Sequence, residues 1–194
     1  MQFTQTLTQC PTFEQEWPIW KARIARQDPI LSEDVTLWRK EALRQFLLAQ
    51  GKNRALTLAI NEFLHWRHQI DLPSDTPNVL NELKTRYRLS VITNGNVEPA
   101  RIHLSQFELV LRGGEHGRAK PHKDLFHQTA RYFKVKPQEI LHVGDNLTTD
   151  VQGAIQAGCQ AVWINLSDNS LTDFTEATVL PTLEIHHLSE LTKL

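Results

Sequence analysis

The sequence predicts an α/β protein in which a Rossmann-like parallel sheet carries an all-helical cap. Up to about residue 70 the chain shows only helical periodicity. From Thr76 onward, short apolar segments alternate with amphipathic helical segments, and the loops between them are short. Such alternation is typical of right-handed crossovers and a parallel sheet. We therefore expect a helical cap over residues 1–73 and a Rossmann-like core over residues 74–194.

The expected cap has three helices. The first runs from about Phe13 to Arg26, the second follows Ser32 as its N-cap and stops at Gly51, and the third carries apolar residues from Leu56 to Ile70. Four of the five tryptophans fall in this part. These four are Trp17, Trp20, Trp38 and Trp66. We interpret them mainly as packing residues of a small bundle. The alternative is that one of them faces the substrate.

The expected core begins with Thr76 as an N-cap and Pro77 at the first helical position, a pairing typical of helix starts. That helix runs to about Lys84. The apolar segments after it predict strands over residues 89–92, 107–111, 140–143 and 161–164. Helices are expected from about Val97, after Lys120-Pro121, and over 149–157 with Gly158 as the stop.

Composition excludes several classes of protein. Lys and Arg number 21 and Asp and Glu 22, so no broad basic field is available to bind nucleic acid. No apolar run approaches the ~20 residues of a membrane span, and the N-terminus does not resemble a signal peptide. The two cysteines, Cys10 and Cys159, fit a reducing compartment better than a disulfide framework. We expect a cytoplasmic protein, and the sequence does not indicate its oligomeric state.

Polar residues follow the strand that ends at Thr93. Ligands of parallel sheets bind beyond the carboxyl ends of the strands. A hydroxyl and successive backbone N–H groups at Thr93, Asn94 and Gly95 would suit an anion there, although the same residues also form ordinary turns. Lys120, just before a helix, could neutralise phosphate charge at this edge, although most lysines are solvated surface residues.

The most informative segment runs from Val143 to Asp150. Asp145 ends one strand and Asp150 opens the next helix, so both carboxylates should lie at the same edge of the sheet. Two close acids repel each other unless a cation lies between them, and oxygen-only ligands suit Mg²⁺. The alternative is that Asp150 is only an acidic first-turn residue, favoured by the helix dipole.

Together these segments resemble the haloacid-dehalogenase superfamily. Thr93, Lys120 and the Asp145–Asp150 pair match its second, third and fourth motifs in order, and the helical first part is similar to its cap. The resemblance implies an Mg²⁺-dependent phosphatase acting on a small phosphorylated metabolite. Asp145 would bind the metal, and Thr93, Asn94 and Gly95 the phosphoryl oxygens. Lys120 would offset developing negative charge, with Asp150 orienting Lys120 or a metal-bound water.

The family's first motif, DxDxT, supplies the nucleophilic aspartate and ends a strand in the middle of the sheet. This sequence contains no Asp-x-Asp. We therefore expect the core to be incomplete, lacking the strand between those that end at Thr93 and Gly144, and this chain alone to be inactive and marginally stable. Two alternatives stay open: a dehalogenase, which needs no metal, and a non-catalytic relic or regulator that keeps the fold.

Overall fold

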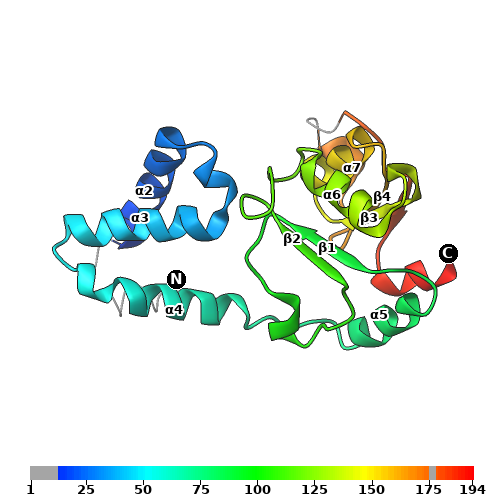
Figure 1. Ribbon diagram of the computed structural model, residues 1–194, viewed down its shortest axis with the longest axis horizontal. Helices are drawn as coiled ribbons and strands as arrows, with labels where there is room; N and C mark the ends of the chain where they lie inside the picture. The colour runs from blue at the N-terminus through cyan, green and yellow to red at the C-terminus, as the bar shows by residue number, and fades with distance from the viewer. Residues whose placement is uncertain (1–12, 175–177) are drawn as a thin grey trace.

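The computed structural model describes residues 13–174 and 178–194, so Cys10 lies outside the described residues. Figure 1 shows two lobes, a helical one and an α/β one, joined by the chain that follows α4 and by contacts across the waist. The helical lobe contains α2 (Phe13–Gln27), α3 (Val35–Ala49) and α4 (Leu56–Arg67). The three expected cap helices are therefore present.

The helical lobe has its own apolar core. Ile24 of α2, Ala59 of α4 and the inner face of α3 pack together, and Phe46 and Leu47 at its centre are fully buried. The expected N-cap of α3 is wrong: Asp34, not Ser32, accepts hydrogen bonds from the N–H groups of Thr36 and Leu37. A carboxylate at the cap also interacts with the helix dipole, which a serine hydroxyl does not.

The tryptophans divide between the core and the surface of this lobe. Trp17 is buried, and Trp20 and Trp38 pack against the core from partly buried positions. Trp66 is 52% exposed, with its indole N–H donating to Glu62 one turn earlier on α4. The packing interpretation is therefore confirmed for three of them and is wrong for Trp66, which lies on the outer face of its helix.

The α/β lobe is built from five short parallel strands. Strands β1 (Ser90–Thr93) and β2 (Leu109–Arg112) form one pair. Strands β3 (Leu141–Gly144), β4 (Gln160–Ile164) and β5 (Leu183–Ile185) form a three-stranded sheet in that order. Among the described residues, β1 and β3 are not hydrogen-bonded to each other. The α/β fold class with parallel pairing is confirmed.

Helices cover both faces of the larger sheet. On one face, Trp163 of β4 is buried by α6 (Asp124–Phe133) and α7 (Gly153–Gln156). On the other face, Val162 of β4 is buried by α5 (Thr76–Lys84) and by the C-terminal turn of 3-10 helix. Neighbouring residues of β4 thus face opposite apolar layers, as expected for a strand covered on both sides. Cys159 is buried in the first layer.

Three elements differ from expectation. Asp75, not Thr76, is the N-cap of α5, without a side-chain cap, and Thr76 is its first helical residue. The helix expected from Val97 is only a 3-10 turn over Pro99–Ile102, which ends where His103 adopts a left-handed backbone (φ 61°). The expected helix over 149–157 begins earlier, as a π turn over Leu147–Gln152 leading into α7.

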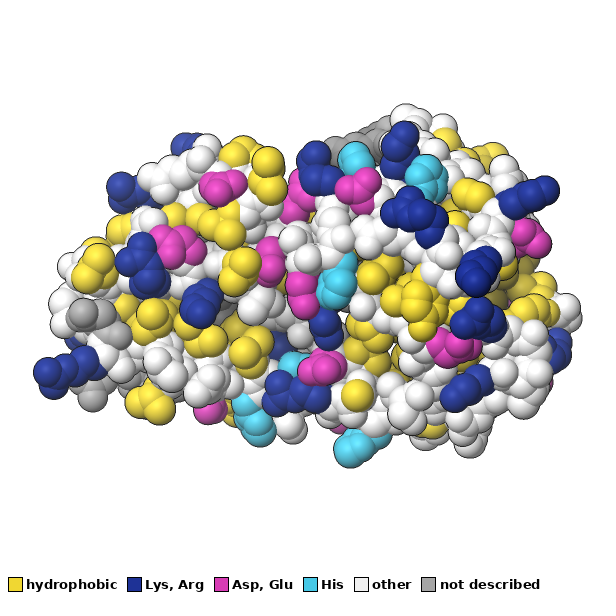
Figure 2. Space-filling model, viewed as in Figure 1, with side chains coloured by type: hydrophobic (Ala, Val, Ile, Leu, Met, Phe, Trp, Pro, Cys, Tyr) yellow, Lys and Arg dark blue, Asp and Glu magenta, His cyan; other side chains and the backbone are white. Residues whose placement is uncertain are grey.

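The lobes touch at the loop that precedes Lys120. The Glu33 carboxylate accepts hydrogen bonds from Arg118 Nε (2.6 Å) and from the Ala119 N–H (2.8 Å). Beside it, a side chain at Gly114 would collide with the backbone of Asp34. Figure 2 shows acidic, basic and histidine side chains gathered along this waist. The helical lobe is thus anchored next to the strand ends that carry the expected site residues.

Candidate active site

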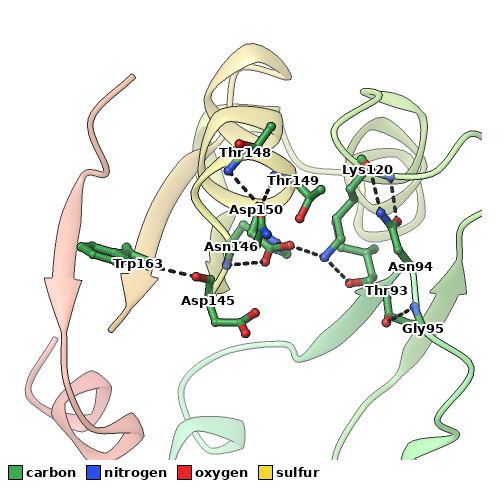
Figure 3. A network of polar contacts seen from close by, with 12 residues as sticks. Thr93, Asn94, Gly95, Lys120, Asp145, Asn146, Thr148, Thr149, Asp150 and Trp163 are labelled. Carbon is green, nitrogen blue, oxygen red and sulfur yellow. Dashed lines mark hydrogen bonds and ion pairs between the residues drawn. The ribbon is translucent and has the colours of Figure 1, made fainter. Parts of the chain in front are cut away.

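The expected site residues meet at one edge of the α/β lobe. Thr93 ends β1, Asp145 directly follows β3, and Lys120 and Asp150 reach in from the segments beside them (Figure 3). Each strand belongs to a parallel set, β1 with β2 and β3 with β4, and ligands of such sets bind at the carboxyl ends of the strands. The structure therefore brings together the four residues that sequence reasoning selected from distant parts of the chain.

Lys120 and Asp150 form a buried ion pair at the centre of the site. Lys120 Nζ donates to Asp150 Oδ1 at 2.5 Å and to the backbone carbonyl of Ile92 at 2.9 Å. The side chains of Lys120 and Asp150 are only 9% and 8% exposed. Such a pair is stable only when further hydrogen bonds satisfy both ions, because each charge has lost its water. Lys120 is therefore held in one position at the end of β1.

The Asn94 side chain fixes the backbone of Lys120. Its Nδ2 donates to the Lys120 carbonyl at 2.7 Å, and its Oδ1 accepts from the Lys120 N–H at 2.8 Å. This two-point contact joins the lysine loop to the turn after β1. Sequence reasoning expected Asn94 to act through its backbone, and the contact of its side chain was not anticipated.

Thr93 and Gly95 form a small turn of their own. The Gly95 N–H donates to Thr93 Oγ1 at 2.8 Å, so in this structure it is engaged by the hydroxyl rather than open to an anion. The hydroxyl proton of Thr93 can still be donated, because the oxygen acts as acceptor toward Gly95. Of the expected phosphate-binding groups, Thr93 therefore retains the clearest capacity to bind an oxygen ligand.

The second oxygen of Asp150 is held by the start of the π turn. Asn146 donates its N–H to Asp150 Oδ2 at 3.1 Å, while its side chain caps the turn by accepting from Thr148 and Thr149. Gly144 is required beside them, because a Cβ there would overlap the Asp150 side chain. The Gly-Asp sequence at the end of β3 thus makes space for the second acid of the pair.

His142, inside β3, is a site residue that sequence reasoning missed. Its Nε2 lies 3.4 Å from Asp150 Oδ1, and its ring packs edge-on against Phe126 with centroids 5.1 Å apart. Burial, together with the charge of Lys120, lowers the pKa of His142, although the neighbouring Asp150 acts in the opposite direction. A neutral imidazole that donates from Nε2 fits this position. The available signal was a polar residue in the middle of an otherwise apolar strand.

Opposing effects set the charge of Asp150. Burial alone would raise the pKa of its carboxyl, but the hydrogen bond from His142 and the charge of Lys120 together lower it well below its usual range. Asp150 is therefore ionised at neutral pH. With one oxygen on Lys120 and the other on Asn146, its geometry suits holding the lysine rather than binding a metal.

Asp145 differs from Asp150 in being exposed. Its backbone carbonyl accepts the indole N–H of Trp163 at 3.0 Å, which fixes the main chain. Within residues 13–174 and 178–194 its carboxylate has no hydrogen-bond or ion-pair partner, and Figure 3 shows it apart from the Lys120–Asp150 network. A free carboxylate at this edge fits Mg²⁺, which is often bound by one or two carboxylates together with water and phosphate oxygens.

The described part of the chain offers Mg²⁺ this single carboxylate. No group of three or more His, Cys, Asp or Glu side chains in that part could hold a metal ion. The fit is therefore one of ligand type rather than of a closed cage, and further ligands would have to come from solvent, a substrate or groups beyond this set.

The described helices also include none long and apolar enough to cross a membrane.

Comparison with known sequences points to one family. Residues 6–158 match the sequence model of the haloacid dehalogenase-like hydrolases. Over 177 residues the chain is 40% identical to the 5-amino-6-(5-phospho-D-ribitylamino)uracil phosphatase YigB of Escherichia coli (strain K12), covering 88% of this chain and 74% of that protein. Over 101 residues it is 37% identical to the human N-acylneuraminate-9-phosphatase, covering 48% of this chain and 41% of the relative.

A solved structure shares the whole fold. The crystal structure of a 2-haloacid dehalogenase from Pseudomonas syringae pv. Tomato DC3000 superposes with a TM-score of 0.88 at 29% identity, over 97% of this chain and 83% of that one. The crystal structure of a phosphatase from Thermococcus onnurineus superposes with a TM-score of 0.59 at 24% identity, which supports the fold alone. The helical lobe and the α/β lobe therefore occur together in known enzymes.

Proposed function

Because the chain belongs to the haloacid dehalogenase-like hydrolases, we propose that it is an Mg²⁺-dependent phosphatase that hydrolyses a small phosphate monoester. The observation that carries the proposal is the convergence of Thr93, Lys120, Asp145 and Asp150 at one sheet edge, in a chain 40% identical to a phosphatase. A hydroxyl, a fixed ammonium and a free carboxylate can bind and neutralise a phosphoryl group there, whereas the attacking nucleophile would have to come from outside this set.

Each residue has a proposed role. Thr93 donates its hydroxyl to a phosphoryl oxygen, with Asn94 and Gly95 shaping the turn. Lys120 offsets the negative charge that develops in the transition state, and Asp150 orients Lys120, as their 2.5 Å contact supports. Asp145 would bind Mg²⁺, which when bound would neutralise phosphoryl charge. Because Lys120 is already held by Asp150, Ile92 and Asn94, little reorganisation is needed when charge develops.

The helical lobe is the proposed cap, with the boundary near residue 73. Its anchor on the core is Glu33, which binds Arg118 and Ala119 directly before Lys120. A cap placed there excludes water from the strand ends while the ester is bound. We propose a cytoplasmic setting and a small-molecule substrate rather than nucleic acid or a membrane.

For the substrate we propose 5-amino-6-(5-phospho-D-ribitylamino)uracil, which would place the chain in riboflavin biosynthesis. Support comes from the match to the Escherichia coli phosphatase, whose alignment spans most of both chains. The test is phosphate release from this ester and from phosphoserine, with Mg²⁺ and after its removal by a chelator. In a form of the protein that also carries a DxDxT strand, release from neither ester, or release unaffected by the chelator, would contradict the proposal.

The same assay tests the expected inactivity of this chain alone. No Asp-x-Asp occurs in the sequence, and in the family that motif supplies the nucleophile. The assay therefore compares the chain as printed with a longer protein that includes any residues its reading frame encodes before Met1. Activity of the printed chain would contradict the expectation, and inactivity of both forms would favour the non-catalytic alternative.

A haloacid dehalogenase is the second candidate function, because a dehalogenase gives the superposition with a TM-score of 0.88. The free carboxylate of Asp145 favours a metal-dependent reaction instead. Chloride release from 2-chloropropionate without added Mg²⁺ would support the dehalogenase, and phosphate release that requires Mg²⁺ would exclude it.

A further inference from the structure

Two arginines on neighbouring helices of the helical lobe lie on either side of Phe63 and, among the described residues, have no acidic partner. Arg39 is on α3 and Arg67 is the last residue of α4. The Arg39 guanidinium lies 5.3 Å from the ring centroid of Phe63, and burial together with the charge of Arg67 lowers the pKa of Arg39. The Arg39 side chain is partly buried, whereas Arg67, one turn after Phe63 on the same helix, is exposed.

The pair differs from other arginines of the protein. Arg44 binds Glu41 and Arg118 binds Glu33, both at 2.6 Å. In the part of the chain that the structure describes, neither Arg39 nor Arg67 forms an ion pair. Like charges at close range repel each other, more strongly where one of them is partly buried, unless an electron-rich group lies between them. The arrangement is therefore suited to a ligand that brings oxygen acceptors.

Lys21 of α2 extends the same positive region. Its ammonium lies 5.8 Å and 5.7 Å from the ring centroids of Trp17 and Trp38, and burial followed by the charge of Arg39 lowers its pKa. All three cap helices therefore contribute a cation to one region.

Asn96 connects the pair to the candidate active site. Arg67 Nε donates to Asn96 Oδ1 at 3.3 Å, and the Asn96 side-chain nitrogen is buried with no hydrogen-bond partner among the described residues. Asn96 is two residues after Asn94, which holds Lys120, and three after Thr93. Arg67 is thus in direct contact with the turn that carries the proposed phosphate-binding residues.

We propose that Arg39 and Arg67 determine specificity by binding paired oxygen acceptors, a carboxylate or two ring carbonyls, on the leaving group of the phosphate ester. The inference rests on the proposed function, since the phosphate must occupy the Thr93–Lys120 end. A guanidinium presents its N–H groups as a fork that matches two neighbouring oxygens. An ester that lacks such oxygens is not bound more tightly because of the pair.

Two pairs of esters test the inference and separate the two sources of acceptors. Uridine 5′-monophosphate differs from ribose 5-phosphate in carrying ring carbonyls, and phosphoserine differs from phosphoethanolamine in carrying a carboxylate. Binding of each is measured by calorimetry without divalent metal, so that the result does not depend on turnover. The proteins are wild type, Arg39→Met and Arg67→Met, with Arg44→Met as the matched control on α3.

In at least one pair, the wild type should bind the acceptor-bearing ester about tenfold more tightly or better, as expected for one charge-assisted hydrogen bond. Arg39→Met and Arg67→Met should each remove this preference and leave the bare ester within twofold. Arg44→Met should retain it. Arg39→Lys, which keeps the charge and loses the fork, should retain part of it and so exclude a folding defect as the cause.

Equal binding within both pairs by the wild type would overturn the inference, as would an equal loss in the Arg44→Met control. Hydrolysis of the four esters with Mg²⁺ is measured separately, in a form of the protein that also carries a DxDxT strand. Absence of hydrolysis together with a preference that depends on Arg39 and Arg67 would refute the proposed phosphatase and leave the acceptor site supported. Hydrolysis without that preference would support the phosphatase and refute the acceptor site.

Discussion

The ion pair between Lys120 and Asp150 gives the sharpest prediction for stability. Replacing Asp150 by Asn removes the counter-charge of a lysine that is only 9% exposed. It also replaces one carboxylate oxygen by an NH₂ group that cannot accept, although Lys120, His142 and Asn146 all approach Asp150 as donors. At least one of these donors is then left without its partner in a buried site.

The expected loss of unfolding free energy is large for the replacement of one oxygen by an NH₂ group. Removing one partner of a buried ion pair costs about 3–5 kcal/mol. For a chain of this size each kcal/mol shifts the melting temperature by about 2–4 °C, so the variant should melt roughly 6–20 °C below wild type. Replacing an exposed side chain normally changes stability by about 0.5 kcal/mol or less.

The measurement is urea unfolding followed by circular dichroism. Asp168→Asn is the control, because the Asp168 side chain is 86% exposed and, among the described residues, pairs with His186 alone, at the surface. Lys120→Met and the double variant Asp150→Asn/Lys120→Met complete a double-mutant cycle. We expect the double variant to lose much less stability than the two single losses added together. An Asp150→Asn variant within about 1 kcal/mol of wild type, or strictly additive losses, would refute the reasoning.

The same pair predicts a pH dependence. Because the pKa of Asp150 is lowered on folding, its contribution is complete above the pKa of an unfolded aspartate, about 4, and is lost as the pH falls toward the folded value. Wild type should therefore lose stability on acidification below about pH 4 more steeply than Asp150→Asn, which lacks this titration. Parallel stability curves for the two proteins would contradict the assignment.

Three further predictions concern other parts of the molecule. In a form of the protein that also carries a DxDxT strand, Asp145→Asn should lower Mg²⁺-dependent phosphate release at least about tenfold, by analogy with the loss of a metal-site group, and change unfolding free energy by less than about 0.5 kcal/mol because the side chain is exposed. Glu33→Gln removes the charged contact with Arg118, so backbone amides 113–120 should exchange with deuterium faster in mass spectrometry while those of β4 do not change. Burial raises the pKa of the Cys159 thiol to about 11, so alkylation by iodoacetamide at pH 8 should be slow in the folded protein and fast in urea; equal rates would contradict the burial.

Sequence reasoning identified the residues of the site whose positions follow from strand direction. Thr93, Asp145 and Asp150 lie at or just after strand ends, and Lys120 precedes a helix that starts beside them. The direction of parallel strands predicts at which edge of the sheet these residues lie, without any knowledge of side-chain contacts. The fold class follows from the same alternation of apolar and amphipathic segments.

The features that sequence reasoning missed depend on which side chains meet across the fold. Glu33 contacts Ala119 across 86 positions of sequence, and no periodicity or motif indicates such a pair. His142 was missed because its place in the site depends on its contact with Asp150, which its neighbours in the sequence do not indicate. The three-residue strand β5 is too short to give an alternating pattern, and only pairing with β4 defines it.

The close approach of Gly114 to the backbone of Asp34 has a consequence for protein engineering. A chimera that grafts the helical lobe of a relative onto this core would bring a foreign turn against a loop shaped for the native one. Any extra bulk on either side would wedge the lobes apart at the very point where Glu33 reaches Arg118 and Ala119. The turn around Glu33–Asp34 and the loop 112–120 therefore form one transplantable unit, and recombination should cut outside both.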